Sequence, residues 1–358
     1  MHPPIGHAAI LRELRDLAGR DDPPHALLLA GAEATGRTFL ARHFALMLNC
    51  ESGQPPAGAS LFADEPPPTA EKPCGECRPC RLIAAHNHPD VIALGPGDTL
   101  CQPRSGESGH AAHPDSRDIR ICQVRGLVDL SARYPLEARY RTIIIEPAER
   151  LGRDAAHAML KTLEEPPGHS VFILVSAAPE ELIETIRSRC RRIDVPFVHR
   201  DEIQQGLIDR GVAPDIAERA AIEARGRPAR AIAFAEQPDL MDDHARFLER
   251  CAAMAAAPVS DRLRYAEDLA GRWRRDRRAV GAELDAWEAF WEARLRLAAH
   301  EENTEALPRI VEALRAIQRA RQDLMAQVQA QPALELMLLQ FPRITLEEPT
   351  EELTPANA

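Results

Sequence analysis

Residues 25–40, HALLLAGAEATGRTFL, join three different sequence patterns within one short stretch. His25–Ala30 is an unbroken apolar run, which is typical of a strand covered on both faces of a sheet. Thr35–Leu48 then follows the spacing of a helix, and a glycine-rich turn separates the two. A strand that passes through such a turn into a helix predicts the first unit of a parallel α/β sheet.

The turn has the spacing of a phosphate-binding loop, G-x-x-x-x-G-K-[ST], from Gly31 to Gly36 and Thr38. Arg37 stands where that motif has Lys, and its planar guanidinium replaces a compact ammonium. Backbone N–H groups at the start of the helix would cradle phosphates. We expect nucleotide binding to be weak or lost. A working nucleotide site, a degenerate relic and a turn that uses its glycines for geometry alone remain open.

A second apolar run, Arg141–Glu146, ends in an acidic residue. In P-loop NTPases an Asp at this position holds Mg²⁺. Here Glu146 takes that position, and Pro147 follows where a second acidic residue would polarise water. The pattern favours a degenerate nucleotide site, and a strand-end carboxylate on a solvated loop is the alternative interpretation.

Strands and helices alternate over the first part of the chain, which predicts an α/β parallel-sheet domain of the P-loop type. Further strands are expected at Val91–Leu94, Val171–Ser176 and Arg192–Val195, and helices at Ile121–Ala132, Asp154–Glu164 and Pro179–Arg187. Two loop segments, 54–73 and 95–116, are rich in Pro and Gly, with Ala in the first and His and Ser in the second. Beyond residue 198 the patterns are helical. We expect an α/β domain at 1–197 with an inserted module near 50–80, helical domains at 198–237 and 238–345, and an acidic tail at 346–358.

Composition narrows the possible functions. The 358 residues carry 44 Lys and Arg against 55 Asp and Glu, a net charge of -11, so the chain is a poor DNA binder by itself. The apolar runs are too short to span a membrane. The first residues lack the pattern of a signal peptide, so we expect a cytoplasmic protein without membrane contact.

Cysteines indicate a metal site. Cys74, Cys77 and Cys80 follow a C-x2-C-x2-C spacing, and Cys50 precedes them. Four thiolates suit tetrahedral, structural Zn²⁺. The run also resembles part of an iron–sulfur motif, but Ala84 stands where a fourth Cys would fall, which favours zinc. His86 and His88 are substitute ligands, and free buried thiols are the remaining alternative.

Thr185–Cys190, with the sequence TIRSRC, ends a predicted helix with two arginines. Arginine at a helix C-terminus is favoured by the helix dipole whatever its function. The sharper interpretation is an arginine finger that reaches ATP bound by a neighbouring subunit.

Together these residues resemble the delta prime subunits of bacterial DNA polymerase III clamp loaders. The resemblance covers residues 1–235. It depends on the cysteine set directly after the P-loop helix, on residues 155–167 (AAHAMLKTLEEPP) and on the TIRSRC stretch. Gly6-His7 and Pro24-His25-Ala26 also resemble the opening of that family.

The resemblance implies an AAA+ module with a helical lid and a helical collar in a hetero-pentamer with gamma/tau motor subunits and delta. Such a subunit is a stator without ATPase activity of its own, and it assists loading of the sliding clamp onto primed DNA. ATP is then bound by neighbouring subunits. By this resemblance Arg189 is the arginine finger, and Ser188 and Cys190 are the flanking residues that position it. The resemblance also implies zinc ligands, which are Cys50, Cys74, Cys77 and Cys80.

Motor subunits of this family carry Lys in the P-loop, an acidic pair after the strand and an Arg in the lid. This chain has Arg37, Glu146–Pro147 and Ala229 at those positions. All three changes favour a subunit that does not hydrolyse ATP. The alternatives are a motor-type or other P-loop ATPase and a zinc-bearing scaffold without a part in catalysis.

Overall fold

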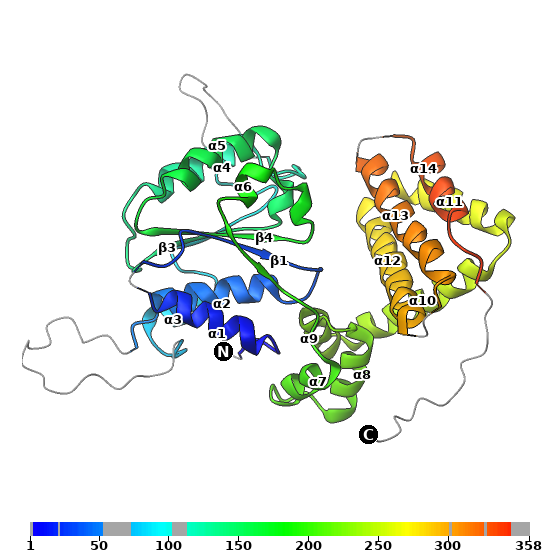
Figure 1. Ribbon diagram of the computed structural model, residues 1–358, viewed down its shortest axis with the longest axis horizontal. Coiled ribbons are helices and arrows are strands. Elements are labelled where there is room, and N and C mark those ends of the chain that lie inside the picture. Colours follow the sequence, from blue (N-terminus) through cyan, green and yellow to red (C-terminus); the bar gives the residue numbers. More distant parts are fainter. Residues whose placement is uncertain are drawn as a thin grey trace, which may run out of the picture. The chain divides into compact units, whose positions relative to one another are not determined.

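The computed structural model describes residues 3–20, 22–52, 73–101, 113–300, 303–325 and 328–344. The chain divides into two compact units, Met1–Glu236 and Gln237–Ala358 (Figure 1). The expected tail at 346–358 lies outside the described residues, as does nearly all of the expected loop at 54–73.

A single five-stranded sheet organises the first unit. Its strands are β1 (Ala26–Ala30), β2 (Val91–Leu94), β3 (Arg141–Ile145), β4 (Ser170–Ser176) and β5 (Arg191–Asp194). All pairings are parallel, in the order β2-β3-β4-β1-β5. Each strand expected from the sequence is present, and β1, β3 and β4 are buried along their whole length. The continuous apolar runs are therefore confirmed as strands covered on both faces.

Helices cover the two faces of this sheet (Figure 1). One face carries α1 (Ala8–Ala18), α2 (Arg37–Asn49) and α3 (Arg78–Ala84), and the other carries α4 (Ile121–Ser131), α5 (Arg153–Glu164) and α6 (Glu184–Arg187). Successive residues of β1 serve opposite cores, because side chains alternate along a strand. Leu27 and Leu29 pack with Leu14 and Phe44, whereas Leu28 packs with Met159.

The prediction of one continuous helix over Pro179–Arg187 is wrong. The segment forms a 3₁₀ turn, Pro179–Glu181, and the single turn of α6, and Leu182 and Ile183 between them are extended. Leu182 and Ile186 are both buried in the same core as α5, so tertiary packing outweighs the helical pattern.

The first unit ends in three helices, α7 (Arg200–Ile208), α8 (Pro214–Ala224) and α9 (Pro228–Glu236). The second unit consists of α10 (Pro238–Ala256), α11 (Val259–Trp273), α12 (Arg277–His300), α13 (Ala306–Met325) and α14 (Ala330–Leu339). Its core is built around Trp287 and Trp291, which pack against Phe341 at ring-centroid distances of 4.8 and 5.3 Å. Among the described residues, every helix is too short or too polar to cross a lipid bilayer.

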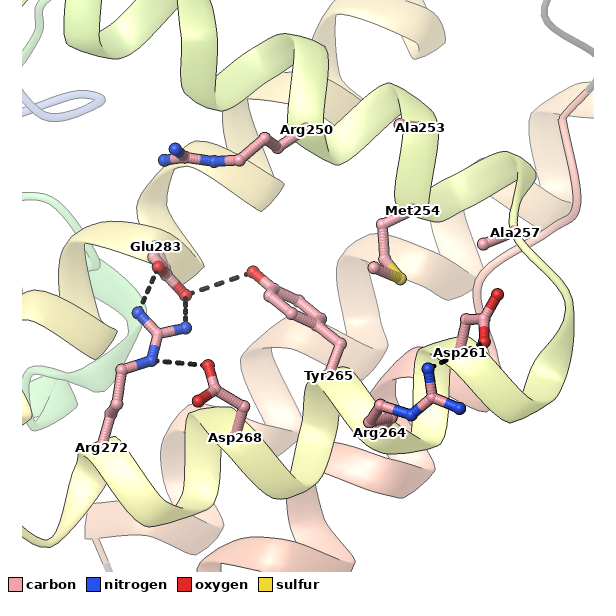
Figure 2. A pocket seen from close by; sticks show the side chains of 10 residues that line it. All are labelled: Arg250, Ala253, Met254, Ala257, Asp261, Arg264, Tyr265, Asp268, Arg272 and Glu283. Atoms are coloured by element: carbon pink, nitrogen blue, oxygen red, sulfur yellow. Dashed lines mark hydrogen bonds and ion pairs between the residues drawn. The ribbon is translucent and has the colours of Figure 1, made fainter.

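An open pocket of about 860 Å³ lies between α10, α11 and the start of α12 in the second unit (Figure 2). Tyr265 donates a hydrogen bond to Glu283 at 3.2 Å, and Arg272 donates two more to the same carboxylate at 2.6 and 2.9 Å. Burial and the Glu283 charge raise the pKa of Tyr265, so its hydroxyl stays protonated. The polar lining is therefore largely paired within itself.

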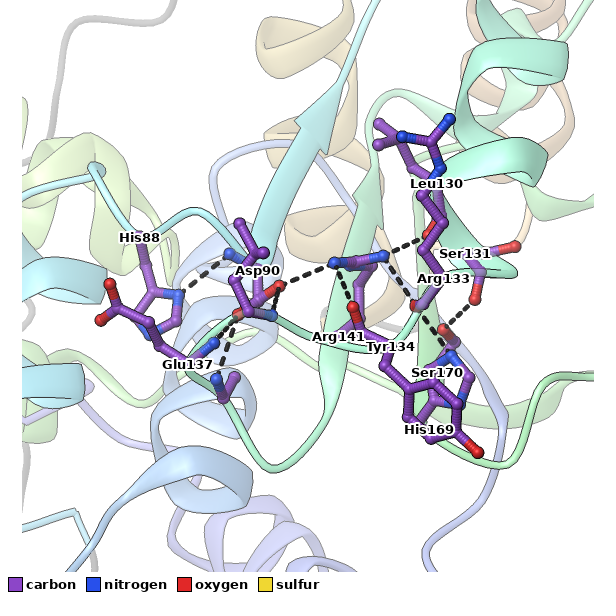
Figure 3. A network of polar contacts seen from close by, with 12 residues as sticks. His88, Asp90, Leu130, Ser131, Arg133, Tyr134, Glu137, Arg141, His169 and Ser170 are labelled. Atoms are coloured by element: carbon purple, nitrogen blue, oxygen red, sulfur yellow. Dashed lines mark hydrogen bonds and ion pairs between the residues drawn. The ribbon is translucent and has the colours of Figure 1, made fainter.

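A buried ion pair connects the sheet to the α4–β3 connection (Figure 3). The Asp90 carboxylate accepts a hydrogen bond from Arg141 Nη2 at 2.9 Å and others from the backbone N–H groups of Leu136, Glu137 and Ala138 at 2.8 to 3.0 Å. Burial alone would raise the pKa of Asp90, but these hydrogen bonds lower it to about 2.

The guanidinium of Arg141 also contacts the backbone at the start of the α4–β3 connection. It donates to the backbone carbonyl groups of Leu130, Arg133 and Tyr134. The ring of Tyr134 stacks on His169 at a centroid distance of 4.5 Å. One ion pair thus holds the segment between α4 and β3 against the sheet.

We expect Asp90→Asn to lower the free energy of unfolding by about 3–5 kcal/mol, because it leaves the buried Arg141 charge without its partner. The folded-state pKa of Asp90 is depressed from its ordinary 3.8 to about 2, so its stabilisation is present above pH 3.8 and is lost as the pH falls toward 2. The difference between variant and wild type should narrow over that range.

Urea unfolding at several pH values measures both effects. Glu137→Gln is the matched control, since its exposed ion pair with Arg78 at 3.0 Å lies in the same region. Equal unfolding midpoints for Asp90→Asn and wild type at neutral pH would contradict the analysis.

Candidate nucleotide and metal sites

The turn after β1 is tightly packed against β5. A Cβ atom added at Gly31 would lie 2.4 Å from the carbonyl oxygen of Val195. Gly36 is the N-cap of α2. The first glycine of the predicted phosphate-binding loop is therefore required by packing, whether or not a phosphate binds there.

Two segments from elsewhere in the chain contact this turn. The backbone N–H of Ala229 in α9 donates to the carbonyl of Ala34 at 3.0 Å. Nε2 of His7 lies 2.8 Å from the carbonyl oxygen of Thr35, and burial lowers the pKa of His7, which favours the neutral ring as donor. The cavity left beside Gly36 measures about 20 Å³. That volume holds about one water molecule.

The polar residues predicted to bind a nucleotide contact one another instead. Thr38 Oγ1 donates to Glu146 Oε1, which joins the two positions that would share a metal ion. Arg37 is 8% exposed, and its Nη1 has no hydrogen-bond partner among the described residues. Burial lowers the pKa of Arg37, and the charges of Glu149 and Glu146 oppose that shift.

The four predicted metal ligands come together beside the other end of α2. Sγ atoms of Cys50, Cys74, Cys77 and Cys80 all lie within 4.8 Å of one another, so the group could hold a metal ion. The backbone N–H of Cys74 donates to Cys50 Sγ, and that of Cys77 donates to Cys74 Sγ, both at 3.4 Å. Leu46 and Ile83 pack around this cluster.

Local contacts give the thiols of this cluster different acidities. Burial would raise the pKa of Cys74, but hydrogen bonds from the backbone of Cys77 and its neighbours lower it to about 6. Burial raises the pKa of Cys80. His86 and His88, the substitute ligands, lie outside the group: His86 contacts Arg42, and His88 Nδ1 accepts from the backbone of Asp90.

Arg189 follows α6 and is partly exposed. Its Nη1 donates to the carbonyl of Thr185 at 2.8 Å, and its Nη2 pairs with Glu164 at 2.5 Å. Ser188 is exposed, whereas Cys190 is 9% exposed, and burial raises the pKa of its thiol to about 12. Cys190 is thus a protonated packing residue beside an accessible guanidinium.

The sequence reasoning missed the contacts that His7 and Ala34 make at the turn after β1. His7 contacts a residue 28 positions away, and Ala34 contacts Ala229 through backbone atoms, so no local pattern indicates either contact. It also missed a second group of metal-type ligands, Cys101, His113 and Cys122. Their wide spacing in the sequence, C-x11-H-x8-C, was the available signal.

These features define a P-loop α/β domain with a four-cysteine insertion and helices behind it. The chain belongs to the DNA polymerase III delta subunit family, whose model matches residues 6–199. Its curated relatives include both delta prime and tau/gamma subunits of DNA polymerase III.

The delta prime subunit of Pseudomonas aeruginosa is 35% identical over 174 residues, which are 49% of this chain and 44% of that protein. The delta prime subunit of Bacillus subtilis is 25% identical over 240 residues, 67% of this chain and 62% of that protein. The tau/gamma subunit of Haemophilus influenzae is 29% identical over 183 residues, 51% of this chain and 22% of that protein. This chain thus spans about half the length of the delta prime relatives, and less of the tau/gamma subunit.

Gly31→Ala should lower the free energy of unfolding by about 1–3 kcal/mol, because the added methyl group overpacks the contact with Val195. Gly168→Ala is the control, since a Cβ there meets nothing within 4 Å. Urea unfolding of both variants tests this. Equal stability of the two would show that the turn after β1 does not need glycine for packing.

Proposed function

We propose that this chain is a non-hydrolysing stator subunit of the DNA polymerase III clamp loader. In this role it assists ATP-dependent loading of the sliding clamp onto primed DNA and supplies Arg189 to ATP bound by a neighbouring subunit. The observation that carries the proposal is Arg37, which stands where the phosphate-binding motif has Lys and whose side chain is buried, with 8% exposed.

Two contacts of the P-loop agree with a subunit that holds no nucleotide. The backbone N–H of Ala229 donates to the carbonyl of Ala34, so the start of α9 lies against the loop. Thr38 donates its hydroxyl proton to Glu146, so the two positions that would share a metal ion contact each other. Similarity to tau/gamma subunits alone does not require hydrolysis, because Arg37 and Pro147 depart from the motifs of P-loop ATPases.

The surroundings of Arg189 support a role in trans. Its contacts are with groups of its own surface, the Thr185 carbonyl and the Glu164 carboxylate. The side chain is 33% exposed and that of Glu164 is 49% exposed, so solvent screens the pair. Exchanging a screened carboxylate for a neighbour's phosphate costs little, and a guanidinium there would neutralise the charge that develops during phosphoryl transfer.

The partners follow from this proposal. Gamma/tau motor subunits and delta complete a hetero-pentamer, in which residues 198–237 serve as the lid and 238–345 as the collar. The net charge of -11 suits a member that leaves most DNA contacts to other subunits.

Zinc is the metal ion that we propose for the cluster of Cys50, Cys74, Cys77 and Cys80. Four sulfur donors make a closed tetrahedral set, which is typical of a structural zinc site. The ion would attach the start of α3 to the end of α2, and its coordination would add to the stability of the first unit.

For the stator role, ATP binding and hydrolysis are measured for the purified chain alone and in the complex reconstituted with its cognate clamp-loader subunits. The chain alone should bind no ATP. In the complex, Arg189→Ala should lower the hydrolysis rate at the neighbouring site by about 10³- to 10⁵-fold. Arg189→Lys should recover part of this loss, since Lys keeps the charge without the fork.

Arg191→Ala is the matched control, because Arg191 is an exposed arginine nearby that pairs with Glu13 at 2.8 Å. Its complex should hydrolyse ATP at the wild-type rate. Unchanged hydrolysis with Arg189→Ala would exclude the finger. Tight ATP binding with turnover by the chain alone would instead identify a motor subunit.

For the metal, Cys80→Ser should remove one zinc ion per chain and lower the thermal midpoint of the first unit, because three thiolates no longer close the coordination sphere. Elemental analysis and thermal unfolding measure the two effects. Cys251→Ala, a buried cysteine of the second unit, should leave the zinc content unchanged. Equal zinc content in Cys80→Ser and wild type would contradict the assignment.

A further inference from the structure

A second group of sulfur and nitrogen donors lies apart from the four-cysteine cluster. Ligand atoms of Cys101, His113 and Cys122 all lie within 4.8 Å of one another. Cys101 follows β2 at the start of a long connection, His113 lies near its end, and Cys122 stands in the first turn of α4.

We propose that Cys101, His113 and Cys122 bind a second zinc ion. This inference is independent of the stator role, since it concerns only how one connection of the first unit is held.

The distances suit a metal better than a bond between the two sulfurs. Cys101 Sγ and Cys122 Sγ are 3.5 Å apart. In a tetrahedral zinc site with Zn–S bonds of about 2.3 Å, two sulfurs lie roughly 3.8 Å apart. A disulfide requires about 2.05 Å. Two cysteine sulfurs and an imidazole around one centre form a donor set that binds zinc in preference to harder cations.

The backbone brings the two ends of the connection together without the metal. Gly97 has φ +81°, and a Cβ added there would lie 2.6 Å from the carbonyl oxygen of Pro114. A side chain at Gly97 would therefore push Pro114, the residue after His113, away from the start of the connection. This close approach places Cys101 and His113 on the same side of α4.

Gln123, the neighbour of Cys122, fixes the third ligand relative to the first. Its side chain is fully buried, and its Nε2 donates to the carbonyl groups of Gly95 at 3.1 Å and Asp98 at 3.0 Å. Its Oε1 accepts from the backbone of Arg120 at 2.7 Å. Such a network holds metal ligands in position ahead of binding, as supporting residues do at known metal sites.

The site has the same supporting pattern as the four-cysteine cluster. The backbone N–H of His113 hydrogen-bonds to Cys101, as the backbone of Cys74 does to Cys50. Among the described residues, no other Cys, His, Asp or Glu joins the group.

A zinc ion here would act as a clip. It would close the chain between Cys101 and His113 into a loop and attach both ends to α4, which reduces the freedom of the unfolded chain. Gly95, where this connection begins, lies beside Glu146: a Cβ added there would be 2.9 Å from the Glu146 carbonyl oxygen. The clip would therefore stabilise the edge of the sheet at the carboxyl ends of the strands, where the P-loop also lies.

The test is the zinc content of the full chain, purified under reducing conditions and measured by elemental analysis and native mass spectrometry. Wild type should hold two zinc ions per chain. Cys122→Ser should hold one, Cys80→Ser should hold one, and the double variant should hold none. Cys251→Ala, the matched control, should hold two.

His113→Ala covers the case in which Cys122→Ser does not fold, because His113 is partly exposed and its loss leaves the helix core intact. This variant should lose its second zinc to a chelator that wild type resists. Cobalt(II) added to Cys80→Ser that also carries Cys74→Ser should give thiolate-to-metal absorption, which Cys101→Ser abolishes.

Three results would overturn the proposal. One is a single zinc ion in reduced wild type. Another is two zinc ions in both Cys122→Ser and His113→Ala. The third is a Cys101–Cys122 disulfide in the reduced preparation, seen as the loss of two hydrogen atoms from the chain mass.

Discussion

Parallel pairing of five strands, of which β1, β3 and β4 are buried along their whole length, is the constraint on which the first unit depends. Because all strands run in one direction, their carboxyl ends meet at one edge of the sheet. The turn after β1, Glu146 after β3 and the connection after β2 therefore lie together, although they are far apart in sequence. Packing fixes the register of β1, since a shift of one residue would move Leu27 and Leu28 into the opposite cores.

The turn after β1 has the spacing of a P-loop, and its residues contact other parts of the first unit. Gly31 is needed where β5 approaches the turn. Above the turn, α9 lies directly on the loop through Ala229, and Thr38 is occupied by Glu146. These contacts hold the turn, α2 and α9 together within the first unit.

Two groups of soft donor atoms lie beside helices on the two faces of the sheet, where they could bind metal ions. The four-cysteine cluster joins α2 and α3, and the group around Cys122 lies at the start of α4. In each case the chain between the first and second ligand is long, and helices hold at least one ligand on rigid backbone. Metal coordination suits this task, because a few strong bonds can order a connection whose sequence has few apolar residues to bury.

Local patterns in the sequence were sufficient to predict the strands and the grouping of the four cysteines. Hydrophobic runs and short chelate spacings act over a few residues, so Ala26–Ala30 and Cys74–Cys80 could be interpreted without the rest of the chain. Tertiary structure alone decided that Ala229 closes on Ala34, that Pro179–Arg187 breaks in the middle, and that Cys101 meets His113 and Cys122. Each of these depends on packing between segments that the sheet brings together, and such packing outweighs the local preference of the residues involved.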